Sequence, residues 1–253
     1  MTRMKRWLWA LARRLHHWDF AVVLPWLARL PLPLGYALAE VRGRMNAQTG
    51  RDWRSMGLGF RHIHRQSVEG YAQWSPEASS FELNSWRRGR FVSEARDEFE
   101  ARLIAGGRLH GLHCDFEPGD ALRHCRQRDR GLVLLTVHFE SFFAGVGFLG
   151  RSGEVINLMS SAVTQDPRVD PAVQAHFEHK YRGLERYLNG GQVLDMELGL
   201  RPFYAMLNRH ETLVLLGDAP VLPQGASMTV GFLGGTRTLA GGGLRMAQRT
   251  GSD

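Results

Sequence analysis

The chain has 253 residues, of which 43% are hydrophobic and 23% are charged, and this composition excludes a disordered chain. Its two cysteines, Cys114 and Cys125, are too few for a disulfide-stabilised scaffold or a four-cysteine zinc site. The formal net charge of +7 resides in the N-terminal part, because residues 1–70 contain 12 basic and 4 acidic residues, whereas the rest contains 20 and 21.

The first 18 residues interleave tryptophan and leucine with basic residues, which predicts an amphipathic helix of the kind that lies in a membrane interface. A second apolar stretch, from Phe20 to Ala39, is interrupted by three prolines and by Arg29. We therefore expect residues 1–45 to form a membrane-associating helical segment, lying on the surface or shallowly embedded as a hairpin. A single spanning helix and a buried helix pair are the alternatives, and a signal peptide fits poorly because no small-residue cleavage pattern follows.

Residues 46–253 are expected to form one α/β domain with a central mixed sheet flanked by helices, because short apolar runs alternate with helical patterns after residue 91. The apolar spacing predicts a helix over residues 51–75, and residues 75–90 are expected to form a loop. Strands are expected at 131–137, 154–158, 192–196, 212–216 and 228–233, and further helices at 171–182, 200–208 and 239–249.

A histidine stands where a very apolar predicted strand ends, in the sequence Leu132-Val-Leu-Leu-Thr-Val-His138-Phe-Glu-Ser-Phe-Phe143. Ligands of α/β proteins collect at the carboxyl ends of strands. Because imidazoles exchange protons near neutral pH, His138 at such a position can act as a general base. The alternative is a structural or capping histidine.

An acidic residue, Asp218, follows another predicted strand, Thr212 to Leu216. It can therefore share a cleft with His138 at the same edge of the sheet. The alternative is that Asp218 caps the turn formed with the Ala-Pro that comes after it.

Several segments, in this order, resemble the lysophospholipid acyltransferase superfamily, and within it the lipid A lauroyl and myristoyl acyltransferases. The resemblance covers most of the chain. It comprises the basic apolar N-terminus with Leu30-Pro-Leu-Pro-Leu-Gly35, the strand ending at His138, Asp166-Pro-Arg-Val-Asp170, Gly199-Leu-Arg-Pro-Phe203, and the segment from Asp218 through Phe232-Leu-Gly234 to Arg249-Thr-Gly251.

The resemblance implies an O-acyltransferase that acts at the cytoplasmic face of a bacterial inner membrane, as a peripheral or single-pass protein. The donor would be a fatty acyl thioester of acyl carrier protein or coenzyme A, and the acceptor a hydroxyl of a lipid or glycolipid. His138 would be the general base. Arg168 and Arg182 would correspond to basic positions that bind a phosphate, although a solvated helix charge is an equal alternative, and Asp218 and Arg237 would be cleft residues.

The chain departs from the family pattern in two places. The family places an orienting acid after four intervening residues, H-x4-D/E, and here that position is Phe143. Glu140 can replace the acid if residues 138–140 are extended, because positions i and i+2 then share a face; in a first helical turn it would point away. Family members also continue past the Thr-Gly with another strand and helix, so the domain would lack the family's C-terminal part.

No cofactor or metal is expected, because the histidine and cysteine spacings match no standard zinc pattern, and no zinc-finger or RNA-binding signature points to nucleic acid. Two other functions compete with the enzyme. One is a catalytically impaired homologue that binds lipid or acyl carrier protein, favoured by Phe143. The other is a basic nucleic-acid or membrane-surface module without catalysis.

Overall fold

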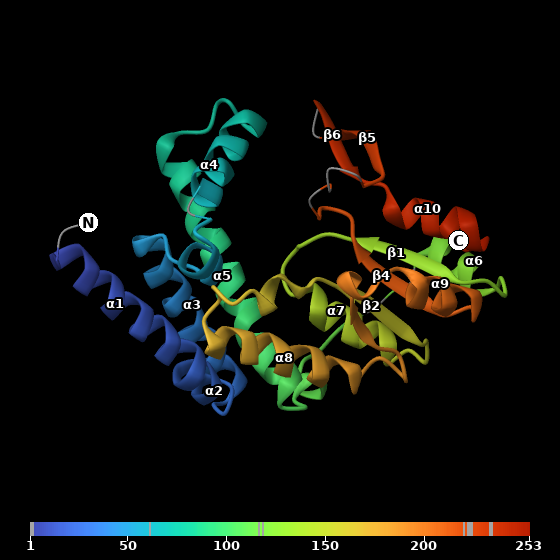
Figure 1. The fold of residues 1–253 in the computed structure, drawn as a ribbon, viewed down its shortest axis with the longest axis horizontal. Helices are drawn as coiled ribbons and strands as arrows, with labels where there is room; N and C mark the ends of the chain where they lie inside the picture. The colour runs from blue at the N-terminus through green and yellow to red at the C-terminus, as the bar shows by residue number, and fades with distance from the viewer. Residues whose placement is uncertain are drawn as a thin grey trace. The chain divides into compact units, whose positions relative to one another are not determined.

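The computed structural model describes residues 3–60, 62–115, 117, 119–219, 221, 225–232 and 235–253 (Figure 1). The chain forms two compact units. The first comprises residues 1–106 and 163–180, and the second comprises residues 107–162 and 181–253, so the division falls inside helix α8 (Pro171–Glu185). The predicted boundary between residues 45 and 46 lies within helix α3 (Leu32–Thr49).

The first unit is helical. Its N-terminal run comprises α1 (Arg3–Trp18), the π-helix η1 (Asp19–Val23) and α2 (Leu24–Leu27), and α3 comes after a short turn. Residues 50–106 of this unit add the π-helix η2 (Arg54–Leu58), α4 (His62–Trp74) and the long α5 (Ser80–Ala105). The 3₁₀ turn η4 (Ala162–Gln165) leads into α8. In the described part of the chain, no helix combines the length and apolar character needed to cross a bilayer.

Small residues bring α3 and α5 into close contact. The buried positions of α3 include Gly35, Ala39, Gly43 and Ala47, which recur every four residues and therefore share one face. A Cβ atom at Gly43 would lie 2.7 Å from the carbonyl oxygen of Phe91 on α5, which is too close for any side chain. Large apolar side chains of α3 are exposed instead, namely Leu34, Val41 and Met45.

The loop predicted over residues 75–90 is wrong, because α5 begins at Ser80. The Ser79 hydroxyl accepts a hydrogen bond from the Glu82 N–H, and the Glu82 carboxylate accepts one from the Ser79 N–H. This reciprocal capping box satisfies two backbone donors and starts the helix despite its weakly periodic sequence. The predicted helix over residues 51–75 is also divided, into η2 and α4.

The second unit is built on a four-stranded parallel sheet in the order β1-β4-β2-β3. The strands are β1 (Leu132–Thr136), β2 (Ile156–Ser160), β3 (Val193–Asp195) and β4 (Thr212–Leu216). The α/β class is confirmed, and the four strands fall at the predicted places. The expected mixed sheet is wrong, because the antiparallel strands β5 (Ser227–Phe232) and β6 (Gly235–Ala240) form a separate pair.

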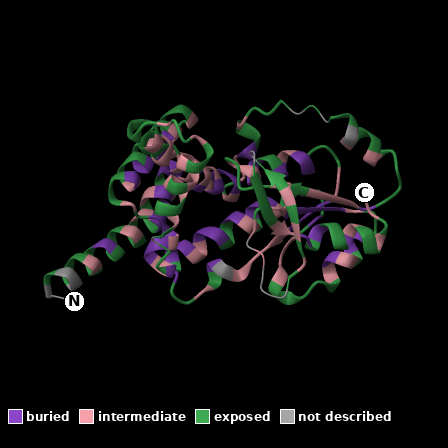
Figure 2. Ribbon diagram, turned by 90° about the horizontal axis from the view of Figure 1, so that it is seen from above, coloured by how far each residue is buried: buried purple, intermediate pink, exposed green. Residues whose placement is uncertain are grey.

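Helices cover the parallel sheet of the second unit. The helices are α6 (Asp120–Arg126), α7 (Phe142–Gly150), α9 (Arg201–Asn208) and α10 (Gly242–Thr250), with the 3₁₀ turns η3 (Leu109–Gly111) and η5 (Met196–Leu198). Leu213 and Leu215 of β4 pack against α9 and α10 in a core cluster with Phe203, Met206, Leu207 and Met246. In Figure 2 the strands of the sheet are mostly purple and pink, whereas the outer loops are green.

The C-terminal elements differ from the expectation in one place. The predicted helix over residues 239–249 begins only at Gly242, because residues 235–240 pair with β5 as β6. The alternation of Thr236 and Thr238 with Arg237 suits a strand with both faces partly exposed. Residues 233 and 234, which the expected strand and the family-like segment include, lie outside the described residues.

Candidate functional site

The register of β1 and β4 brings His138 and Asp218 together. Thr136 pairs with Leu216 at the ends of these neighbouring parallel strands, and the Gly217 N–H donates to the Thr136 carbonyl at 2.7 Å. His138 and Asp218 each stand two residues after this last pair. Parallel strands end at the same edge of a sheet, so the two side chains meet there.

The Asp218 carboxylate holds His138 through two contacts. Its Oδ2 atom accepts a hydrogen bond from the His138 backbone N–H at 2.9 Å, and its Oδ1 atom lies 3.0 Å from the ring Nδ1. An ionised carboxylate can only accept hydrogen bonds, so the arrangement favours the tautomer with the proton on Nδ1. The Nε2 lone pair is then free to take a proton.

The imidazole of His138 is accessible from the solvent. The His138 side chain is 54% exposed and that of Asp218 is 37% exposed. The ring of Phe142, the first residue of α7, contacts the imidazole edge-on with a centroid distance of 5.5 Å. Val137 and Phe139 on either side of His138 are also exposed, so apolar surface flanks the ring.

Phe143, which occupies the position of the family's orienting acid, points into the core. It is 8% exposed and packs on Phe142 and Tyr181, with centroid distances of 3.9 and 5.9 Å. The carboxylate that contacts the imidazole therefore comes from another strand end rather than from α7.

Glu140 does not take the place expected for it beside the ring. The backbone turns after β1, with the Phe139 N–H donating to the Val137 carbonyl at 2.7 Å, and Glu140 adopts a φ of 45°. Residues 138–140 are thus not the extended run that would place positions 138 and 140 on one face. Glu140 is exposed, and the contact to the His138 Nδ1 is made by Asp218.

The three predicted arginines occupy different elements. Arg182 is exposed on α8, and Arg237 is exposed on β6 opposite Val230, both in the second unit. Arg168 belongs to the first unit and pairs with Asp166 through two contacts of 2.7 and 2.9 Å. Hydrogen bonds from Arg168 lower the pKa of Asp166 to about 2, so this arginine already has an anionic partner.

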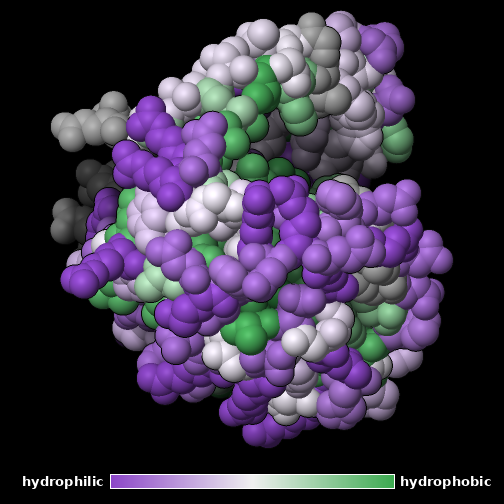
Figure 3. Space-filling view, turned by 90° about the vertical axis from the view of Figure 1, so that its right-hand side faces the viewer, coloured by the Kyte–Doolittle hydropathy of each residue, from purple (hydrophilic) through white to green (hydrophobic). Residues whose placement is uncertain are grey.

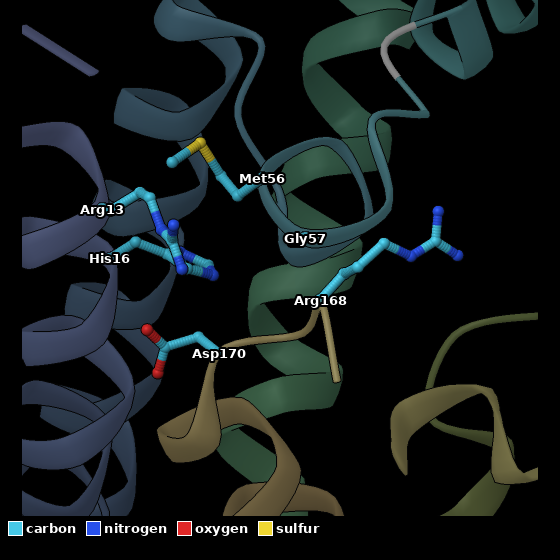
Figure 4. Close-up of a pocket in the computed structure, with 6 residues that line it drawn as sticks. All are labelled: Arg13, His16, Met56, Gly57, Arg168 and Asp170. Atoms are coloured by element: carbon cyan, nitrogen blue, oxygen red, sulfur yellow. The ribbon is translucent and has the colours of Figure 1, made fainter. Parts of the chain in front are cut away.

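Arg168 also borders a small cavity of the first unit with Arg13, His16, Met56, Gly57 and Asp170 (Figure 4). The cavity has a volume of about 10 Å³, which is space for one water molecule. In Figure 4 the Arg168 side chain extends away from Arg13, His16 and Asp170. This cavity is too small to hold a lipid phosphate or pantetheine.

A feature that the sequence did not indicate is a buried ionic cluster in the first unit. Arg42 on α3 donates a bifurcated hydrogen bond from Nε to both oxygens of the Asp19 carboxylate, at 2.8 and 2.9 Å, and a second from a terminal nitrogen at 2.6 Å, and it pairs with Glu98 on α5. Burial raises the pKa of Glu98 to about 7, although Arg42 acts in the opposite direction. The signal that the sequence offered was the single charge of Asp19 within an apolar stretch.

Within the described ranges, no group of three or more histidine, cysteine or acidic side chains is arranged to hold a metal ion. Cys114 and Cys125 are free thiols. A scan against models of known protein families and a search of curated proteins find no match to this chain.

Proposed function

We propose that this protein is an acyltransferase that moves a fatty acyl group from a thioester of acyl carrier protein or coenzyme A to a hydroxyl of a lipid or glycolipid. The observation that supports it best is the pair formed by His138 and Asp218 at the carboxyl edge of the sheet. Such a pair, with an imidazole side chain that is 54% exposed, is suited to removing a proton from an alcohol. The proposed site of action is the cytoplasmic face of a bacterial inner membrane.

In the proposed reaction, His138 Nε2 takes the proton of the acceptor hydroxyl as its oxygen attacks the thioester carbonyl carbon. Collapse of the tetrahedral intermediate forms the ester and breaks the carbon–sulfur bond, and the imidazolium returns its proton to the leaving thiolate. Asp218 positions the ring and stabilises its charged form during the step. The steps need no redox cofactor, because no atom changes oxidation state.

A second candidate is a catalytically impaired homologue that binds lipid or acyl carrier protein. Phe143 at the position of the motif acid favours it. The contact between Asp218 and His138 favours the active enzyme, because it supplies an orienting carboxylate from β4.

The test is the release of thiol from a long-chain acyl thioester in the presence of a lipid alcohol, with the ester product identified by mass spectrometry. We expect His138→Asn to abolish turnover, because asparagine retains a donor toward Asp218 but has no base at the Nε2 position. His210→Asn is the matched control, since His210 is also an exposed histidine whose Nδ1 lies 2.7 Å from a carboxylate, that of Asp129. Equal rates for wild type and His138→Asn would overturn the proposal.

A further inference from the structure

Large apolar side chains form a continuous exposed stripe along the N-terminal helical run. Apart from the adjacent Trp7 and Leu8, they recur every three or four residues and therefore lie on one side of a helix. Their exposed fractions range from 39% to 70%. This docking stripe consists of Met4, Trp7, Leu8, Leu11, Leu15, Trp18, Val22 and Trp26.

The π-helical turn η1 joins the two parts of the docking stripe. Within η1, Phe20 is buried and the Asp19 carboxylate bonds to the buried Arg42, while Val22 remains exposed. The ion pair thus anchors the inner side of the turn and leaves the stripe on the outer side.

Helix α3 also exposes large apolar side chains. Its small residues face α5, whereas Leu34, Val41 and Met45 are exposed. In water, large apolar residues are expected to face the core, and the reverse order is typical of helices that pack through small residues and face lipid. By contrast, the face shown in Figure 3 is mostly hydrophilic, with apolar side chains only in small separate patches.

The charge and residue types of this region indicate the chemistry of its partner. Three of the eight residues in the docking stripe are tryptophans, which favour the boundary between lipid headgroups and acyl chains. Arg14 and Arg29 are exposed in the same helical run, and residues 1–70 carry a net charge of +8. A positive helix with an apolar stripe complements an anionic bilayer surface, whereas two copies of it would repel each other.

We propose that the docking stripe binds the surface of an anionic phospholipid bilayer, with α1, η1 and α2 lying in the plane of the interface. This binding mode goes beyond the proposed acyl transfer and stands without it. The contacts would begin at Met4 and continue past the π-helical turn to Trp26.

The test is flotation of the full-length protein with vesicles of phosphatidylcholine alone or with phosphatidylglycerol. Leu11→Glu and Trp26→Glu place the same charge in the stripe before and after η1. Ala10→Glu is the matched control, because Ala10 is exposed but lies roughly 120° from the stripe centre at about 100° per residue. We expect each stripe variant to weaken binding to anionic vesicles about tenfold or more, with Ala10→Glu close to wild type.

The outcomes separate the two proposals. His138→Asn should bind vesicles like wild type, so loss of activity and loss of binding are distinguishable. Circular dichroism checks that each variant is folded, which the exposure of the substituted positions favours. Unchanged flotation of Leu11→Glu and Trp26→Glu would overturn the inference, as would a stripe-dependent dimer without vesicle binding. An effect of Leu11→Glu alone would overturn the continuous stripe.

Discussion

Asp218 restrains His138 from the end of the neighbouring strand. The ring Nδ1 and the backbone N–H of the same histidine both contact this carboxylate, which restrains the backbone and the ring together. The expectation that both residues share one edge follows from two apolar strands that each end in a polar residue. That Asp218, rather than Glu140, contacts the ring depends on the turn after β1, which single-sequence patterns do not specify.

The buried position of Phe143 predicts that placing an acid there does not increase the proposed acyl transfer. Phe143→Asp would place a carboxylate among aromatic rings and remove their packing, which should cost about 3 kcal/mol or more of unfolding free energy. Urea denaturation and thiol release measure the two effects. Phe143→Leu, which stays apolar, is the control. A large gain in turnover for Phe143→Asp would show instead that the native site is impaired.

His176 makes the stability of the first unit depend on pH. It is fully buried on α8, and neither ring nitrogen has a hydrogen-bond partner among the described residues. Burial lowers its pKa well below 6.5, and the nearby positive charges of Arg102, Lys180, Arg42 and His179 lower it further. The unfolded chain therefore binds a proton that the folded chain does not, and stability is lost as the pH falls through 6.5.

His176→Phe should remove this loss, because the ring lies between Phe20 and Phe177 and phenylalanine suits that environment. Between pH 8 and pH 5, the unfolding free energy of the variant should rise by about 2 kcal/mol relative to that of wild type. This value follows from about 1.4 kcal/mol for each pH unit below 6.5. All seven tryptophans lie within residues 1–86, so tryptophan fluorescence during urea unfolding reports on the first unit. Burial of Glu98 makes stability depend on pH in the opposite direction, and this contribution cancels in the comparison because both proteins contain Glu98. Parallel pH profiles for the two proteins would contradict this account.

At the scale of elements, the first unit depends on one arginine that joins three helices. Arg42 on α3 binds Asp19 of η1 and Glu98 of α5. Arg42→Met would leave two carboxylates without their cation, and we expect it to cost about 3–5 kcal/mol in tryptophan-monitored unfolding. Arg44→Met on the same helix removes only an exposed pair with Glu40 and should change stability by about 0.5 kcal/mol or less. Similar losses for both variants would contradict the structural role of Arg42.

The elements that sequence patterns predicted well are those with a strong local signal. The apolar runs gave β1 and β4, and Asp170 before Pro171 marked the start of α8. Helix α5 was missed because its start depends on a capping box within a polar stretch, and β6 because its largely exposed segment contains no apolar run. The inward face of α3 was missed because its small residues, although spaced every four positions, carry little hydrophobic signal, and the partner helix α5 was not predicted.

At the scale of the whole molecule, the excess of positive charge and the proposed catalytic pair belong to different units. The positive excess of residues 1–70 and the docking stripe lie in the first unit, whereas His138 and Asp218 lie in the second. The proposed division assigns attachment to a lipid surface to one unit and proton transfer to the other. Each can thus be disabled without the other, which makes the two proposals independently testable.

The measurement that tests the central claim most directly is a double-mutant cycle on the rate of acyl transfer, using His138→Asn, Asp218→Asn and the double variant. If the two residues act as one base, each single change should lower the rate by about 10³- to 10⁴-fold and the double variant should be no slower than His138→Asn, while Glu140→Gln stays near wild type. Losses that multiply in the double variant, or a wild-type rate for Asp218→Asn, would contradict the account.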